Sequence, residues 1–273
     1  MPKTPSHADR TPEPDSGRSS RLTVEKLDVQ IHPDTPTLAR AAADEAASVM
    51  RSSVAARGAA HVMFATGNSQ LAFVDALTAG TPEVPWSDIV VFHMDEYVGV
   101  GPDHPAGFQR WIRERIVDRV RPRQAYYLDG MADPERECER YARLLVEKPL
   151  DLCCLGIGEN GHLAFNDPPF ADFDDPADVK VVELDEASRR QQVHEGHFGE
   201  LGDVPRQAVT VTIPALLRAN RVLAVVPEER KSAPVAAALQ GPLSTTCPAS
   251  ILRTKDNVTL HLDARSASKL ELP

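Results

Sequence analysis

The sequence lacks a long apolar run, an excess of positive charge and a cysteine framework, and each lack excludes a class of protein. No run reaches the ~20 apolar residues that a membrane-spanning helix needs. The net charge of −10 argues against nucleic acid or an anionic membrane as the main partner. The four cysteines show no metal-ligand spacing, and Cys153 and Cys154 stand side by side in an apolar segment, where sulfur acts as a small hydrophobic group. We therefore expect a protein of the reducing cytoplasm.

The overall amino-acid composition is that of an ordinary globular protein. Hydrophobic residues make up 42% and charged residues 26% of the 273 residues, a length that suits one large α/β domain or two small ones. The first 22 residues are rich in Pro, Ser, Asp and Arg and contain no apolar core. We expect residues 1–21 to form a disordered tail and residues 22–273 to form a single α/β domain.

Apolar strands alternate with helical segments along the rest of the chain. The pattern predicts strands at residues 27–31, 61–65, 88–93, 150–155, 179–184, 209–213, 222–226 and 258–262. It predicts helices at residues 37–57, 70–78, 106–120, 134–147, from 186 onward, 214–219 and 229–239. Several strands are apolar throughout, which is typical of parallel strands covered on both faces. The expected fold is therefore α/β, a three-layer, mostly parallel, Rossmann-like sheet with helices on both faces.

A glycine-rich segment after the strand at 150–155 has the spacing of a dinucleotide-binding fingerprint. Residues 156–161 read Gly-Ile-Gly-Glu-Asn-Gly. That fingerprint requires a helix to open at the third glycine, so that its amides face a pyrophosphate. Here residues 166–169 read Asn-Asp-Pro-Pro, which cannot continue a helix. We therefore expect no cofactor, and we interpret the glycines as shaping a loop that presents His162 and Asp167.

Three polar loops, at residues 66–69, 94–99 and 156–168, each directly follow a predicted strand. In a parallel sheet, ligands bind at the carboxyl ends of the strands. The three loops would therefore meet at one edge of the sheet, and this convergence favours a ligand site there.

The first of these loops has the features of a phosphate site. Thr66, Gly67, Asn68 and Ser69 form a strand-to-helix turn that offers amides and hydroxyls to an anion. The commoner interpretation of such a turn is a helix N-cap at Ser69 with no ligand. Lys231, in the first turn of a later helix, is badly placed for the helix dipole. It is either a surface lysine or a residue that faces an anion.

The second loop supplies a candidate general base. Asp95 and Glu96 follow an apolar strand, and a partly desolvated carboxylate there can accept a proton. Two adjacent acids point in different directions, so we expect one of them to face the site. His93 lies inside the end of the strand and is expected to be packed.

The third loop supplies a candidate proton relay. As a histidine, His162 can move a proton to and from a ring oxygen. Asp167 could hold its tautomer, and Asn160 could bind the imidazole or a substrate hydroxyl. The alternative is a histidine that only hydrogen-bonds the loop. A metal is not expected, since no second His or Cys stands at a ligand spacing from His162.

These motifs resemble the glucosamine-6-phosphate deaminases, also called isomerases, within a wider group that includes the 6-phosphogluconolactonases. The resemblance runs from about Leu27 to Asp263. Residues 92–99 (Phe-His-Met-Asp-Glu-Tyr-Val-Gly) and 156–168 resemble the deaminase form of the two loops rather than the lactonase form. Residues 208–213 and 248–250 extend the similarity.

The resemblance implies a role for each loop. Asp95 would move a proton from C2 to C1 of an amino sugar, and His162 with Asp167 would open the pyranose ring. The 66–69 loop and Lys231 would hold the phosphate. The implied substrate is a phosphorylated amino sugar. A homo-oligomer is compatible with the sequence.

The chain departs from the family pattern at several positions. It has Asn68-Ser69-Gln70 where the family often has Gly-Thr/Ser-Pro, Asp167 where a glutamate is usual, and Asn160 at a slot that is Asp in some members. A phosphate-contacting arginine of the family has no match between residues 189 and 197. Nearby substitutes are four side chains, Arg189, Arg190, His194 and His197.

The sequence thus predicts a deaminase that converts glucosamine 6-phosphate to fructose 6-phosphate and ammonia. One alternative keeps the fold but hydrolyses a sugar lactone, as a 6-phosphogluconolactonase does. Another is a protein that binds a sugar phosphate without catalysis, which the departures at Asn68, Asn160 and Asp167 motivate.

Overall fold

The computed structural model describes residues 19–168 and 170–271, and the first 18 residues of the expected tail lie outside them. The first strand, β1 (Ser20–Val24), pairs antiparallel with β2 (Leu27–His32). The tail boundary predicted at Arg21 therefore falls inside a strand. In the described residues, no helix combines the length and apolar character needed to cross a membrane.

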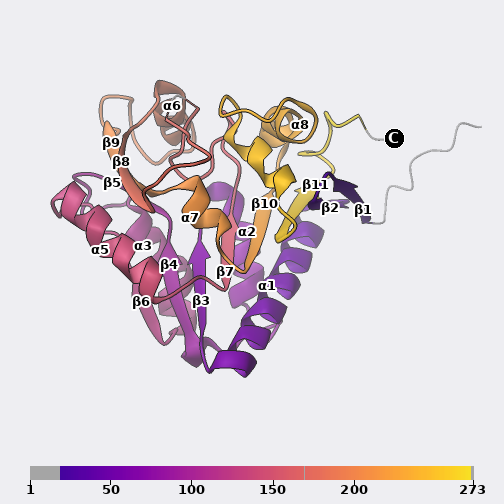
Figure 1. Ribbon diagram of the computed structural model, residues 1–273, viewed down its shortest axis with the longest axis horizontal. Helices are drawn as coiled ribbons and strands as arrows, with labels where there is room; N and C mark the ends of the chain where they lie inside the picture. Colours follow the sequence, from indigo (N-terminus) through magenta and orange to yellow (C-terminus); the bar gives the residue numbers. More distant parts are fainter. Residues whose placement is uncertain (1–18, 169, 272–273) are drawn as a thin grey trace, which may run out of the picture.

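The larger sheet of the described chain has eight strands in the order β1-β2-β11-β10-β7-β3-β4-β6 (Figure 1). Every neighbouring pair except β1 and β2 is parallel, which confirms the mostly parallel α/β fold. The strands not yet given are β3 (Ala60–Phe64), β4 (Ile89–His93), β6 (Gln124–Tyr126), β7 (Leu152–Leu155), β10 (Arg221–Val226) and β11 (Val258–Asp263). Strands β4 and β7 are buried along their whole length, as the apolar runs predicted.

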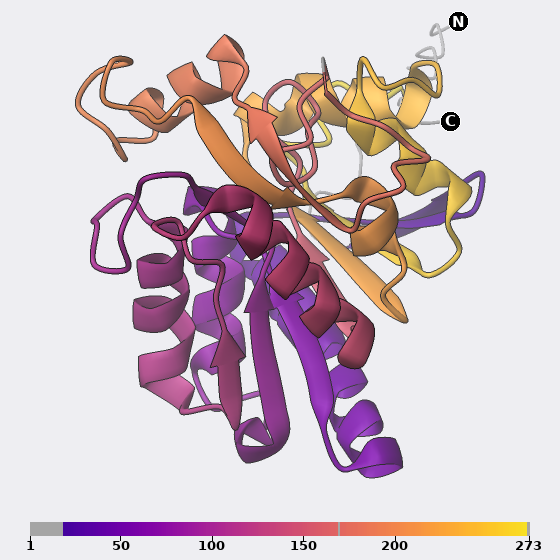
Figure 2. The same ribbon diagram turned by 60° about the vertical axis from the view of Figure 1, so that its left-hand side comes forward.

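Helices cover both faces of this sheet. One face carries α1 (Thr35–Arg57), α2 (Leu71–Thr78) and the continuous run of α3 (Phe108–Ile112), η3 (Arg113–Val117) and α4 (Asp118–Val120). The other carries α5 (Pro134–Glu147), α7 (Ile213–Leu217) and α8 (Ser232–Gln240). Figure 2 shows α5 in front of the central strands and α1 behind them. Because strand side chains alternate, Cys153 packs in one hydrophobic cluster and Cys154 in the other.

A second, antiparallel sheet of three strands was not predicted. It has the order β5-β9-β8, formed by β5 (Asp95–Tyr97), β9 (Gln207–Val211) and β8 (Val179–Glu183). Figure 1 shows it at the upper left beside α6 (Glu186–His194), beyond the end of β3. Two of its strands were expected from their apolar pattern, but pattern alone does not say which sheet a strand joins.

The remaining elements are short 3-10 turns: η1 (Asn68–Gln70), η2 (Trp86–Asp88), η4 (Glu229–Lys231) and η5 (Pro248–Thr254). Two of them, η1 and η4, open the helices α2 and α8 directly after strands β3 and β10.

The strand order of the sheet changes direction between β3 and β7. After β3 it adds β4 and β6 on one side, and it then places β7 and β10 on the other side. Such a switch point leaves a crevice at the carboxyl ends of the strands. Four neighbouring strands, β10, β7, β3 and β4, therefore deliver their following loops to one place, as the sequence predicted for three of them.

Tyr141 of α5 holds the end of β4 and gives a test of this arrangement. Its buried hydroxyl donates to the carbonyl of His93 at 2.7 Å and accepts from the His93 amide at 3.2 Å. Tyr141→Phe removes this partner from both backbone groups, so we expect the free energy of unfolding in urea to fall by about 1–3 kcal/mol. Tyr126→Phe, whose half-buried hydroxyl has no partner in the described chain, should change it by less than about 0.5 kcal/mol. Equal effects of the two changes would contradict this account.

Candidate active site

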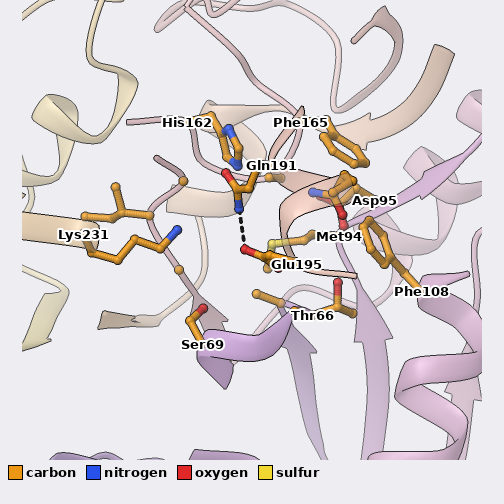
Figure 3. Close-up of a pocket in the computed structure, with 17 residues that line it drawn as sticks. Thr66, Ser69, Met94, Asp95, Phe108, His162, Phe165, Gln191, Glu195 and Lys231 are labelled. Atoms are coloured by element: carbon orange, nitrogen blue, oxygen red, sulfur yellow. Dashed lines mark hydrogen bonds between the residues drawn. The ribbon is translucent and has the colours of Figure 1, made fainter. Parts of the chain in front are cut away.

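A cavity of about 80 Å³ lies at the carboxyl ends of β10, β7, β3 and β4 (Figure 3). Loops after all four strands contribute to its wall, together with α6 and the start of α3. The lining residues on which the chemistry depends are Thr66, Gly67, Ser69, Asp95, His162, Gln191, Gln192, Glu195 and Lys231. The site residues predicted from the three loops and Lys231 therefore converge, although three of them stand behind the wall rather than in it: Asn68, Asn160 and Asp167.

Asp95 is the acid of the second loop that faces the cavity. Asp95 is only 7% exposed. Burial raises the pKa of its carboxyl well above the usual value, and the negative charges of Glu96 and Asp167 raise it further. Glu96 points the other way and accepts amide hydrogens from Tyr97, Phe108 and Gln109 at 2.7 to 3.2 Å. It thereby anchors the start of α3.

His93 is packed, as its place in the strand predicted. It is fully buried, and its Nε2 accepts the amide hydrogen of Leu128 at 2.9 Å. Burial lowers the pKa of His93 to about 3, so its ring is neutral at physiological pH. It contributes to the support of β4 rather than to the cavity wall.

His162, which lines the cavity, lies in hydrogen-bonding distance of the Asp167 carboxylate behind it. Its Nδ1 lies 2.9 Å from Asp167 Oδ1, and Asp167 is completely buried. Burial alone would raise the pKa of Asp167, but its hydrogen bonds and the charge of His162 lower it to about 2. An ionised Asp167 fixes the hydrogen of the imidazole on Nδ1 and leaves Nε2 free to accept a proton.

Further hydrogen bonds hold Asp167 in place. Asn160 donates to Asp167 Oδ1 at 3.0 Å, and its own side-chain oxygen accepts the His162 amide hydrogen at 3.1 Å. Ser188 of α6 donates to the same carboxylate oxygen, and the Asp185 amide donates to Oδ2 at 3.3 Å. Asn160 is thus a support for the pair, and the geometry does not place it against a substrate hydroxyl.

The glycines of this loop make room for the histidine. A Cβ on Gly158 would lie 2.2 Å from Nε2 of His162, so no side chain fits at that position. Gly161 has a φ of +86° and packs against Cys247, whose Sγ would lie 2.8 Å from an added Cβ. The fingerprint-like spacing therefore arises from packing of the imidazole and not from a pyrophosphate.

The first loop presents its backbone to the cavity. Among the described residues, no acceptor is found for the amide N–H groups of residues 66–69, which precede the α2 helix. Gly67 occupies the N-cap, and no side chain caps the turn, so Ser69 is not the N-cap residue of the alternative interpretation. Asn68 turns away from the cavity and donates to the backbone oxygen of Glu195 at 3.2 Å.

Lys231 is buried and not a surface lysine. It is 2% exposed, and its ammonium group has no hydrogen-bond or ion-pair partner in the described part of the chain. Figure 3 shows the amine pointing toward the middle of the cavity. Burial, followed by the charge of Arg230, lowers the pKa of Lys231 to about 8. A buried amine without a partner indicates that this end of the cavity receives an anion.

Helix α6 supplies cavity residues that the sequence analysis missed. Its buried face is polar: Ser188, Gln191 and Gln192 are each less than 9% exposed, and Glu195 follows one turn later. The spacing i, i+3, i+4 and i+7 is that of a helix face that normally packs in a core. Polar residues at all four places were the available signal that this face covers a site.

Most of the substitutes considered for the missing arginine do not face the cavity. Arg189 donates to the carbonyls of Leu201 and Val204, and Arg190 pairs with Glu186 on the outer side of α6. His194 is exposed. His197 lies close to the site, with Nε2 at 3.3 Å from Glu195 Oε2.

In residues 19–168 and 170–271, no three His, Cys, Asp or Glu side chains gather as a metal site would require. The expectation that the protein uses neither a metal nor an organic cofactor stays a prediction.

Comparison with known proteins agrees with this geometry. The model of the family described as glucosamine-6-phosphate isomerases/6-phosphogluconolactonase matches residues 33–261. A glucosamine-6-phosphate deaminase of Exiguobacterium sibiricum is 36% identical over 207 residues, 76% of this chain and 79% of that relative. One from Bacillus cereus is 35% identical over 205 residues, 75% of this chain and 76% of the relative.

Solved structures share the fold. A monomeric glucosamine-6-phosphate deaminase superposes with a TM-score of 0.79 at 27% identity, covering 89% of this chain and 99% of its own. A 6-phosphogluconolactonase from Shewanella baltica has a TM-score of 0.68 at 21% identity, covering 89% of this chain and 97% of its own, and shows the fold alone. The chain belongs to the glucosamine-6-phosphate isomerase/6-phosphogluconolactonase family.

Proposed function

We propose that the protein is a glucosamine-6-phosphate deaminase, which converts glucosamine 6-phosphate and water to fructose 6-phosphate and ammonia. The observation that carries the proposal is the content of one cavity. A buried amine without a partner, Lys231, lies at one end, and a buried carboxylate with a raised pKa, Asp95, lies at the other. Release of ammonia from amino-sugar 6-phosphates tests it.

His162 performs the ring opening in this mechanism. With its hydrogen held on Nδ1 by Asp167, Nε2 takes the proton of the C1 hydroxyl and delivers it to the ring oxygen as the C1–O5 bond breaks. The product is the open-chain aldehyde. The buried Asp167 keeps the transient imidazolium stable, because the two charges lie in contact away from water.

Asp95 then performs the isomerisation. The hydrogen on C2 is acidic because it lies α to the C1 aldehyde, and Asp95 takes it and returns it to C1. The ammonium group on C2 gives one proton to the C1 oxygen, so C1 becomes a hydroxymethyl carbon and C2 an iminium carbon. Water then attacks C2, which releases ammonia and leaves the C2 ketone of fructose 6-phosphate. A carboxylate with a raised pKa suits this step because its basicity approaches that required near neutral pH.

The phosphate lies at the other end of the cavity. Lys231 supplies a positive charge, and the amides of residues 66–69 point out of a strand-to-helix turn whose Gly67 and Ser69 line the wall. This end fixes the sugar so that C1 and C2 reach His162 and Asp95.

The proposed setting is the cytoplasm, since the four cysteines are free thiols. The proposed partner is the sugar phosphate alone, without nucleic acid or membrane. The monomeric deaminase among the related structures provides a precedent for a single subunit.

Anion binding should depend on pH through Lys231. Its pKa of about 8 in the empty site means that above this pH the amine is neutral, and an anion must bring a proton with it. We expect the Kd of sulfate, which does not titrate in this range, to rise about tenfold per pH unit above pH 8. Isothermal calorimetry from pH 6 to 10 measures it.

The matched control is Lys231→Arg, since a guanidinium stays charged over the whole range. Its sulfate affinity should be flat with pH, although weaker than that of the native protein at pH 7. A native Kd that is unchanged between pH 7 and 10 would show that Lys231 does not bind the anion.

A further inference from the structure

The cavity already contains an anion of the protein. Figure 3 shows the Glu195 side chain in the middle of the view, between Lys231 and Asp95. Its carboxylate accepts hydrogen bonds from Arg230 at 2.6 Å and from Gln191 at 2.9 Å, and His197 lies 3.3 Å from its second oxygen. Burial would raise the pKa of Glu195, but these contacts lower it to about 2, so the carboxylate is ionised at neutral pH.

Glu195 lies close to the part of the cavity assigned to the phosphate. A Cβ on Gly67 would be 3.8 Å from Glu195 Oε2, and the Asn68 side chain holds the backbone oxygen of the same residue. The charge of Glu195 acts on Lys231, whose pKa it raises against the effect of burial. A phosphate dianion that binds Lys231 and the amides of residues 66–69 would therefore meet an ionised carboxylate.

Glu195 also takes up space in the cavity. Its side chain is 7% exposed and forms part of the lining, together with Gly67, Ser69 and Lys231. A ligand held by Lys231 and the 66–69 loop would therefore lie against this carboxylate.

We propose that Glu195 is a specificity-determining residue: its carboxylate occupies the phosphate end of the empty cavity, and only a ligand with a strong anion displaces it. The identity of that ligand as a phosphate ester rests on the proposed function. A neutral sugar brings no charge to offset the loss of the Glu195 contacts with Arg230, Gln191 and His197, so it is excluded. A phosphate repels the carboxylate and takes its place among the cations.

The surroundings of Glu195 permit this movement. It follows the last residue of α6, and Gly196 behind it has a φ of +80°, a backbone conformation that glycine adopts freely. Arg230 keeps two other partners, Glu228 at 2.6 Å and Glu159 at 3.1 Å, when Glu195 leaves. The guanidinium of Arg230 therefore stays paired after Glu195 is displaced.

The test is the Kd of inorganic phosphate at pH 7, measured by isothermal calorimetry on the full chain. Glu195→Gln keeps the shape of the side chain but removes the competing charge, so we expect phosphate to bind at least about tenfold more tightly. The matched control is Glu186→Gln, an exposed glutamate on the same helix, which should stay within about twofold of the native protein. Unchanged or weaker phosphate binding by Glu195→Gln would overturn the proposal.

A second measurement uses the native protein and does not depend on a variant that folds. In a crystal soaked with inorganic phosphate, the ion should lie at Lys231 with the Glu195 carboxylate more than 4 Å from Arg230. Phosphate bound beside an unmoved Glu195 contradicts the proposal. The proposed function can fail separately. If Glu195→Gln tightens phosphate binding but the native protein releases no ammonia, the role of Glu195 is supported and the deaminase function is wrong.

Discussion

Asp95→Asn should reduce kcat for ammonia release from glucosamine 6-phosphate by about 10²–10⁴-fold, the usual contribution of a general base. Asparagine has nearly the shape of aspartate but cannot carry the C2 proton. Lys231 and Ser69 lie at the other end of the cavity (Figure 3), so the Kd of inorganic phosphate should stay close to the native value. A coupled assay for ammonia, with phosphate calorimetry on the same sample, measures both.

The matched control for this change is Asp44→Asn, an exposed aspartate on the outer side of α1. It should leave kcat and the Kd of phosphate within about twofold of native values, as surface substitutions usually do. If Asp95→Asn turned over like the control, the assignment of the base would be wrong even though the fold and family stand.

Gly158→Ala should produce the second large loss, although it replaces no group that reacts. The added Cβ would lie 2.2 Å from Nε2 of His162, so the imidazole must leave its place against the loop. We expect kcat to fall about 10²-fold or more, the order of effect of losing a general acid–base group. The free energy of unfolding should fall by about 1–3 kcal/mol, the usual cost of overpacking.

Gly101→Ala separates this effect from the general cost of replacing a loop glycine. A Cβ there would lie no closer than 3.8 Å to its nearest neighbour, Met131. That variant should keep native kcat. A Gly158→Ala enzyme with native kcat would show that His162 does not need its observed position.

The larger sheet could be predicted from the sequence because hydrophobic alternation is a local property. The apolar runs at β4 and β7 marked buried parallel strands, and the loops after β3, β4 and β7 met as expected because these strands are neighbours. The prolines after the 156–161 glycines excluded a helix there, and the structure places His162 against Gly158 in that loop.

The second sheet could not be predicted in the same way. Strand β5 is three residues long and directly follows the β4 loop, so it leaves no periodic pattern. Its pairing with β9 depends on contacts between segments more than a hundred residues apart. Pattern at short range does not determine which partner a short strand finds.

The site was predicted where a single loop carries it and missed where side chains from distant segments meet. Asp95, His162 and Lys231 each stand beside a pattern that can be seen locally: an apolar strand, a glycine turn and the start of a helix. Glu195 does not, because its importance comes from Arg230 and Gly67, which other loops bring to it. Asn160 and Asp167 were expected in the site and stand one layer behind it, since their short side chains are taken up by hydrogen bonds around His162.

The most direct test of the account is an ammonia-release assay on the native protein with the 6-phosphates of glucosamine, galactosamine and mannosamine, and with unphosphorylated glucosamine. The account predicts ammonia and fructose 6-phosphate in equal amounts from glucosamine 6-phosphate, and no turnover of the unphosphorylated sugar. No ammonia from any amino-sugar 6-phosphate, together with rapid hydrolysis of a 6-phosphogluconolactone, would contradict it.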